Sequence, residues 1–135
     1  MNARFIFNAW ILLIGLIVFA FTSVQDPKPW VVPEKEAKAV NPLKADPETM
    51  SNGKSLWGQH CSSCHGKTGL GDGSKAAQLK TEPGNFTSSQ TQNQSDGSLY
   101  YKISEGRGDM PSFKKKIPEK DDIWSLVVFI RSLKK

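Results

Sequence analysis

The clearest hydrophobic pattern in the chain lies at its C-terminal end. Ile123, Leu126, Val127 and Ile130 follow the i, i+3, i+4, i+7 spacing of a helix that buries one face. Acidic residues precede this stripe and Arg131 follows it, which is the charge order that a helix dipole favours. The pattern therefore predicts a helix that closes the chain.

A second helix is predicted over residues 47–59, with Asp46 as its N-cap. Shorter helices are expected over residues 74–80 and 97–105, the latter capped by Asp96. No stretch alternates apolar and polar residues as a strand would. The sequence thus predicts an all-α fold.

The first 45 residues divide into two zones. Residues 5–21 are apolar except for Asn8, and Arg4 precedes them, which is typical of a secretory signal or of a membrane anchor. Either would place the rest of the chain in the periplasm or on the outer face of the cytoplasmic membrane. The next zone contains four prolines among Lys and Glu without an apolar period, which predicts an extended linker. We therefore expect a signal peptide or anchor at residues 1–23, a linker at 24–45 and one folded domain at 46–135.

The chain is mildly basic, with a formal net charge of +5. Without residues 1–23, 17 basic and 13 acidic residues remain, a net charge of +4. Binding of nucleic acid normally needs a clustered basic face on a recognisable reader fold, and neither is present. The only run of basic residues is Lys114, Lys115 and Lys116. Such a run suits either the docking of an acidic partner or a solvated loop.

The main candidate for chemistry is Cys61-Ser62-Ser63-Cys64-His65, which contains both cysteines of the chain. Two cysteines three positions apart and followed by histidine form the attachment motif of c-type haem. In one helical turn, both sulfurs can reach the vinyl groups of one porphyrin while the imidazole lies under the ring centre. The motif therefore predicts covalently attached haem c.

Other interpretations of these residues lack a necessary feature. A zinc site needs four ligands, and the only further Cys or His is His60, directly beside Cys61. A thioredoxin-like redox pair needs a preceding strand, and none is predicted. The glycine-rich segment 66–73 lacks the spacing of a phosphate-binding loop, which would require glycine at position 61.

A haem used for electron transfer needs a second axial ligand, and the chain has three methionines. Met1 is terminal, and Met50 lies on a predicted helix where we expect it to fill the core. Met110 instead lies in a glycine-rich loop before Pro111, where the backbone can approach a flat ring closely. Met110 is therefore the candidate ligand.

These motifs, with the closing aromatic-rich helix, resemble the class I, single-haem c-type cytochrome family over about residues 46–135. The resemblance implies a small fold in which the first and last helices cross around one covalent haem. It implies that His65 and Met110 are the axial ligands of the haem iron. It also implies that Cys61 and Cys64 are the thioether anchors.

The same resemblance assigns two further positions. The carbonyl of Pro83 is the candidate acceptor for the ring proton of His65. Gly53 is expected where the two helices cross, against Trp124 or Phe129.

The resemblance implies an electron carrier rather than an enzyme. Its partners would be respiratory redox proteins, such as a quinol-oxidising complex and a terminal oxidase or reductase. A retained N-terminal segment would instead favour a tethered haem subunit of a larger oxidoreductase or oxidase complex. A third alternative, a haem sensor or peroxidase, needs an open distal site, and His60 is expected to point away from that site.

Overall fold

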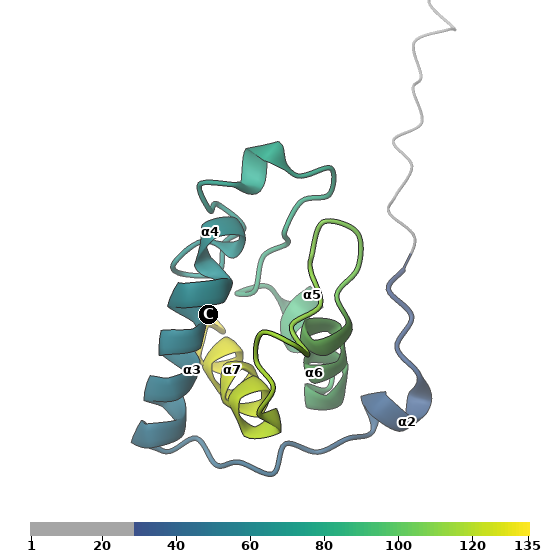
Figure 1. Ribbon diagram of the computed structural model, residues 1–135, viewed down its shortest axis with the longest axis vertical. Coiled ribbons are helices and arrows are strands. Elements are labelled where there is room, and N and C mark those ends of the chain that lie inside the picture. The colour runs from purple at the N-terminus through teal and green to yellow at the C-terminus, as the bar shows by residue number, and fades with distance from the viewer. Residues whose placement is uncertain (1–28) are drawn as a thin grey trace, which may run out of the picture.

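Helices α3 and α7 cross at the centre of the molecule, and shorter helices pack around this pair (Figure 1). The computed structural model describes residues 29–135. In chain order the elements are α2 (Glu34–Ala37), α3 (Pro47–His60), α4 (Ser62–His65), the 3-10 turn η2 (Ala76–Gln78), α5 (Ser89–Gln92), α6 (Asp96–Glu105) and α7 (Lys120–Ser132).

The all-α fold is confirmed, because within residues 29–135 the only β-type pairing is an isolated bridge between Arg107 and Met110. In the same range no helix is both long enough and apolar enough to cross a bilayer. The signal or anchor predicted at residues 1–23 lies outside the described residues.

Helix α3 begins as its sequence predicts. The carboxylate of Asp46 accepts a hydrogen bond from the backbone N–H of Thr49 at 2.8 Å, and Pro47 occupies the first helical position, where no N–H is needed. This hydrogen bond lowers the pKa of Asp46 below its usual value of 3.8. The helix ends at His60, one residue beyond the predicted end.

The crossing of α3 and α7 depends on Gly53. A Cβ atom at this position would lie 2.1 Å from the carbonyl oxygen of Ser125 and 2.9 Å from the Cβ of Phe129. Only glycine allows this approach, and the expected contact between Gly53 and Phe129 is confirmed. One turn later, the rings of Trp57 and Phe129 pack with their centroids 5.6 Å apart.

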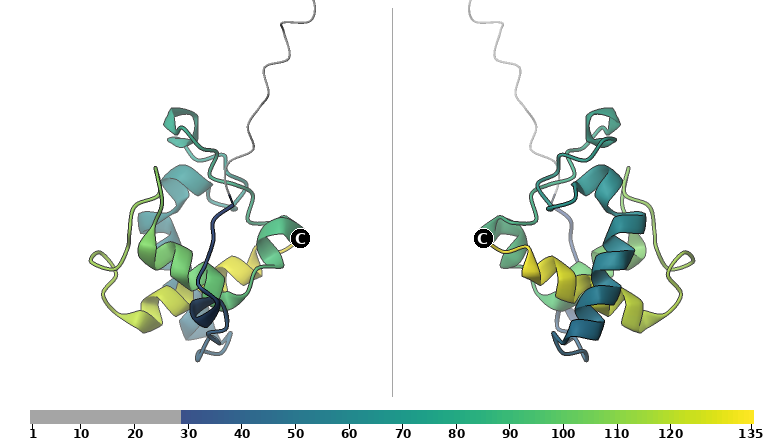
Figure 2. Two further views of the ribbon diagram at one scale, coloured as in Figure 1. Left: turned by 90° about the vertical axis from the view of Figure 1, so that its right-hand side faces the viewer. Right: turned by 90° about the vertical axis from the view of Figure 1, so that its left-hand side faces the viewer.

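Helix α7 supplies most of the core. Every residue from 123 to 130 is buried, so the predicted one-sided stripe has become a helix covered on all sides. Helices α3 and α6 cover two faces of α7, and residues of the N-terminal segment contact a third (Figure 2).

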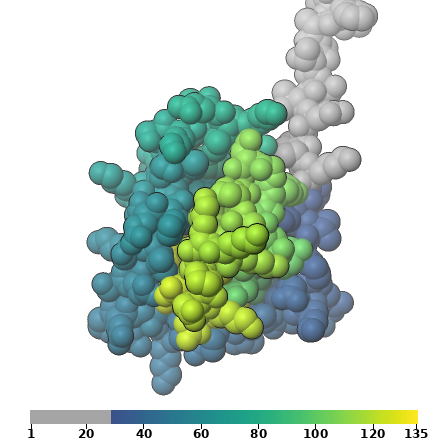
Figure 3. Space-filling model, viewed as in Figure 1, coloured from purple at the N-terminus to yellow at the C-terminus, as the bar shows by residue number. Residues whose placement is uncertain are grey.

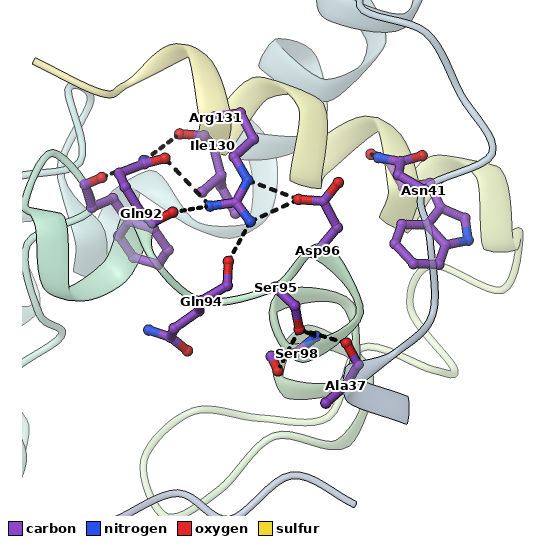
Figure 4. Close-up of polar contacts among 11 residues, drawn as sticks. Ala37, Asn41, Gln92, Gln94, Ser95, Asp96, Ser98, Ile130 and Arg131 are labelled. Atoms are coloured by element: carbon purple, nitrogen blue, oxygen red, sulfur yellow. Dashed lines mark hydrogen bonds and ion pairs between the residues drawn. The ribbon is translucent and has the colours of Figure 1, made fainter. Parts of the chain in front are cut away.

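Helix α6 begins one residue earlier than its predicted cap implied. The N-cap is Ser95, whose hydroxyl accepts from Ser98 N–H, and Asp96 is the first helical residue. The Asp96 carboxylate instead pairs with Arg131 at the end of α7. Arg131 also donates to the backbone carbonyls of Gln92 and Gln94, so one guanidinium joins α7 to the turn before α6 (Figure 4).

Residues 33–45, within the predicted linker, pack against the domain. They form the short helix α2 and run along α6 and under α7, where they cover one flank of the domain (Figure 3). The hydroxyl of Ser95 donates to the carbonyl of Ala37 at 2.6 Å, and the Asn41 side chain donates to the carbonyl of Trp124 at 3.1 Å. These polar contacts hold a segment that has no apolar period of its own.

The region between α4 and α6 is mostly loop. The helix expected over residues 74–80 is reduced to the three-residue turn η2, and the short helix α5 was not predicted. Partly buried Ala76 and Leu79 are the only apolar contacts of the first segment, too few to stabilise a longer helix.

Candidate functional site

The residues singled out from the sequence lie around one cavity of about 260 Å³, most of it apolar. Its walls come from the end of α3, from α4, from the loop before α5 and from the loop after α6. All five predicted site residues are among its lining: Cys61, Cys64, His65, Pro83 and Met110.

The Cys61–His65 motif forms the short helix α4, and the glycine-rich segment after it satisfies the last carbonyls of that helix. The amides of Lys75, Gly73 and Gly71 donate to the carbonyls of Ser63, Cys64 and His65 at 2.8, 3.1 and 2.9 Å. A Cβ at Gly73 would lie 2.4 Å from the Ser63 carbonyl oxygen. The glycines after the motif therefore let the chain fold back over α4, which fixes the motif from behind.

The imidazole of His65 is held by aromatic side chains on its buried side. The ring of Phe86 meets it edge to face with centroids 4.8 Å apart, and the ring of Trp57 lies 5.8 Å away. The indole Nε1 of Trp57 donates to the carbonyl of Gly66 at 3.0 Å, which ties α3 to the residue after the motif. Trp57 thus lies behind His65 and is not part of the cavity lining.

The buried nitrogen of His65 bears on the assignment of Pro83. Burial lowers the pKa of His65, and the nearby Pro83 carbonyl acts in the opposite direction. Nδ1 is buried and has no hydrogen-bond partner among the described residues. The carbonyl is therefore close enough to favour a protonated ring, but it does not form a hydrogen bond of normal geometry.

Met110 is half-buried in the cavity wall, in a loop that folds back on the end of α6. Gly106 ends α6 with a φ of +67°, and a side chain there would collide with the backbone of Pro111. Arg107 and Met110 then pair through two backbone hydrogen bonds of 2.8 and 3.1 Å. The loop is thus a tight turn that presents Met110 from a fixed backbone.

Asp109 joins this turn to the opposite wall. Its carboxylate accepts from the backbone amide of Lys80 at 2.7 Å and from that of Thr81 at 3.3 Å. The Met110 loop and the loop that contains Pro83 are therefore connected, although they are far apart in sequence. Nothing in the residues around Asp109 indicated this contact.

The thiols of the motif lie in an apolar setting. Burial, and to a lesser extent the neighbouring Cys64, raises the pKa of Cys61 to about 12. A thiol with that pKa is almost entirely protonated at neutral pH, whereas reactive cysteines of redox pairs have lowered pKa values. The structure therefore disfavours a thioredoxin-like use of the pair.

The position of His60 differs from the one that the sequence predicted. His60, expected to point away, is half-buried in the lining, where its ring packs against Phe113 with centroids 5.9 Å apart. Trp30 also lines the cavity, as does Arg107. Tyr100 lies elsewhere, with its ring 4.3 Å from that of Trp124.

The lysine run lies beside the cavity. The ammonium of Lys116 is 5.7 Å from the ring centroid of Phe113, which lines the cavity. Lys114 forms an ion pair with Glu105, and all three lysines are exposed.

Comparisons with known proteins agree with this site. The family model described as "Cytochrome C oxidase, cbb3-type, subunit III" matches residues 48–130. A stretch of 52 residues, 38% of the chain, is 44% identical to quinohemoprotein alcohol dehydrogenase ADH IIB of Pseudomonas putida, of which it spans 8%.

Two solved structures share the fold. A chain of the Kuenenia stuttgartiensis reducing HAO-like protein complex Kustc0457/Kustc0458 superposes with a TM-score of 0.61 and 26% identity, over 83% of this chain and 53% of that one. The KustC0563 c-type cytochrome superposes with a TM-score of 0.54 and 30% identity, over 62% of this chain and 98% of that one.

The family match covers the whole motif, both crossing helices and the Met110 loop. The cavity also brings together the side-chain groups that suit c-type haem. Two thiols could attach the haem, and an imidazole and a thioether could ligate its iron, within mostly apolar walls. The chain therefore belongs to the c-type cytochrome family described as cytochrome c oxidase, cbb3-type, subunit III, whose members bind haem c covalently and transfer electrons.

Proposed function

We propose that the protein is an exported single-haem electron carrier whose haem iron is ligated by His65 and Met110. The observation that carries this proposal is that Met110 lines the same cavity as the Cys61–His65 motif, although 45 residues separate Met110 from His65. Cys61 and Cys64 would hold the haem through thioether bonds. When bound, the haem iron supplies a one-electron redox couple, with a potential that histidine and methionine ligation raises.

The protein's own residues fix the geometry of the two ligands. Trp57 and Phe86 hold the imidazole plane of His65, whose Nδ1 is buried without a partner among the described residues, and the nearby carbonyl of Pro83 acts to raise the pKa of this histidine. A small movement of that carbonyl would complete a hydrogen bond from Nδ1, which leaves Nε2 for the iron. Met110 is positioned by its backbone pairing with Arg107. His65 and Met110, both on prearranged backbone, would therefore be the residues that hold the iron.

The decisive experiment replaces Met110 with alanine and compares Met50→Ala as the matched control. Met50 is also a partly buried methionine, but it packs on the core from α3 and does not line the cavity. Met110→Ala should lower the reduction potential and let carbon monoxide bind the reduced iron. Met50→Ala should keep the wild-type spectrum and lose about 2 kcal/mol or more of stability.

Two results would contradict this assignment. An unchanged optical spectrum in Met110→Ala would show that Met110 is not a ligand. Wild-type protein that binds carbon monoxide as readily as the variant would have an open iron site, as in a haem sensor or peroxidase, and His60 in the cavity wall would then be the residue to test.

A tethered haem subunit of a larger complex is the second candidate. It is favoured by the comparisons, since one similar chain is part of a reducing HAO-like protein complex and the matched stretch of the alcohol dehydrogenase is a small part of that enzyme. The apolar run at residues 5–21 would be the anchor. Intact mass spectrometry of protein from its native host separates the two, because an anchored form begins at Met1 and a released form near residue 23.

We propose that electron donors and acceptors bind to the lysine run through an acidic surface of their own. Such partners would include a quinol-oxidising complex and a terminal oxidase or reductase. Lys115 and Lys116 are exposed beside the cavity, and complementary charge raises encounter rates. Lys115→Glu with Lys116→Glu should slow electron transfer with an acidic partner and weaken the dependence of its rate on salt. Lys54→Glu is the control: Lys54 is an exposed residue of α3 that does not line the cavity, so this change should have little effect on the rate of electron transfer.

A further inference from the structure

Trp30 connects the N-terminal segment to the haem cavity. It is half-buried, and it belongs to the cavity lining together with the Met110 loop. Its neighbour Val31 is 82% exposed, whereas Val32 is half-buried like Trp30. The chain therefore enters the folded domain at the wall of the cavity.

Two cations lie over the indole of Trp30. The guanidinium carbon of Arg107 is 4.8 Å from the ring centroid, and the ammonium of Lys102 is 5.5 Å from it. Both distances are within the range of a cation–π attraction. Lys102 belongs to α6 and Arg107 to the loop after it, so one ring bridges the helix and the loop.

The loop contact leads directly to Met110. Arg107 N–H donates to the carbonyl of Met110, and Met110 N–H donates to the carbonyl of Arg107. A displacement of the Arg107 backbone must therefore move the backbone of Met110. Gly106, just before this pair, has a φ of +67°, a conformation that glycine adopts without strain.

The segment that carries Trp30 is itself fixed to the domain. A Cβ at Gly97 of α6 would lie 2.1 Å from the carbonyl oxygen of Glu36, so α2 lies in direct backbone contact with α6. The bond between Ser95 and Ala37 adds a polar anchor, and Figure 2 shows this segment running along α6. The chain just after Trp30 is thus fixed to α6.

We propose that Trp30 is a positioning residue that holds Arg107 at the cavity wall and so keeps Met110 in place as a ligand, an inference that rests on the Met110 ligation proposed above. The N-terminal segment then acts as a brace on the ligand loop. Loss of the indole removes its cation–π contact with Arg107, which weakens the restraint on the turn, and Met110 leaves the iron more often.

The test measures the rate of carbon monoxide binding to the reduced full-length holoprotein, together with the reduction potential. That rate depends on the fraction of protein in which Met110 is displaced. Trp30→Ala removes two cation–π contacts and should raise the rate about 5- to 30-fold and lower the potential. Trp30→Phe keeps a weaker aromatic face, so its rate should lie between those of the wild type and Trp30→Ala. Val31→Ala should bind carbon monoxide at the wild-type rate.

A double-mutant cycle tests whether Trp30 acts through Arg107. In the background of Arg107→Gln, the further change Trp30→Ala should alter the carbon monoxide rate by less than about twofold. A full effect of Trp30→Ala in that background would overturn the proposed route through Arg107.

Comparison with Met110→Ala separates this inference from the function on which it rests. If Met110→Ala opens the iron while Trp30→Ala binds carbon monoxide within twofold of the wild-type rate, the positioning role of Trp30 is refuted. The proposed ligation by Met110 would remain supported. An unchanged spectrum in Met110→Ala would instead refute the ligation itself, and with it the brace.

Discussion

Replacement of Gly53 by alanine should separate the two central helices. The added Cβ would lie 2.1 Å from the carbonyl oxygen of Ser125 and 2.9 Å from the Cβ of Phe129. A backbone carbonyl cannot rotate away, so α3 and α7 must move apart, and overpacking of this kind costs about 3 kcal/mol at the upper end of its usual range. Alanine returns about 1 kcal/mol through its better helix propensity. The free energy of unfolding should therefore fall by about 2 kcal/mol.

Gly58 provides a matched control in the same helix. It is exposed, and a Cβ there would meet nothing within 4 Å, so Gly58→Ala should gain up to about 1 kcal/mol from helix propensity alone. Urea unfolding of the holoprotein, followed by far-ultraviolet circular dichroism, should show the two variants differing by about 3 kcal/mol. Equal stability of Gly53→Ala and Gly58→Ala would refute the claim that close approach at Gly53 sets the helix crossing.

Three further predictions concern polar contacts. Arg131→Gln removes the guanidinium bonds drawn in Figure 4 and should lower the free energy of unfolding in urea by about 1–2 kcal/mol, since the ion pair with Asp96 is partly exposed. Asp46→Ala removes the cap of α3. The pKa of this carboxyl is lowered in the folded state. The cap therefore stabilises the fold fully at pH values above the unfolded pKa near 3.8, and it loses its effect as the pH falls through the folded pKa. The urea midpoints of wild type and variant should thus converge in acid. Asp109→Ala, which leaves the amide of Lys80 unpaired, should raise the rate of carbon monoxide binding to the reduced protein, and an unchanged rate would show that this link does not restrain the Met110 loop.

Local signals predicted the parts of this structure that are determined locally. Asp46 followed by Pro47 specifies the start of α3 because the cap and the fixed φ act on the same first turn. The Cys61–His65 motif is local because its two cysteines and its histidine lie within five residues. Met110 was predicted as the second ligand from its glycine-rich context, and it lies in the wall of the cavity that the motif also lines.

The errors arose where a distant residue decided between two local choices. Ser95 and Asp96 can both cap a helix, and the sequence does not rank them. Asp96 is engaged by Arg131, 35 positions away, which leaves the cap to Ser95. In the same way, the link from Asp109 to Lys80 crosses 29 positions, and no periodicity or motif reports such a pair.

The N-terminal segment shows the limit of composition as a guide. Residues 24–45 are rich in proline and charge, which correctly indicates a segment without its own core. The last carbonyl groups of a short helix such as α2, however, have no partner within the helix, and a neighbouring helix with hydroxyls and glycines can approach and bind them. Ser95 donates to one such carbonyl, and Gly97 leaves room for another at Glu36. The surface that orders this segment thus belongs to α6, which is distant from the segment in sequence. The same segment places Trp30 in the cavity wall.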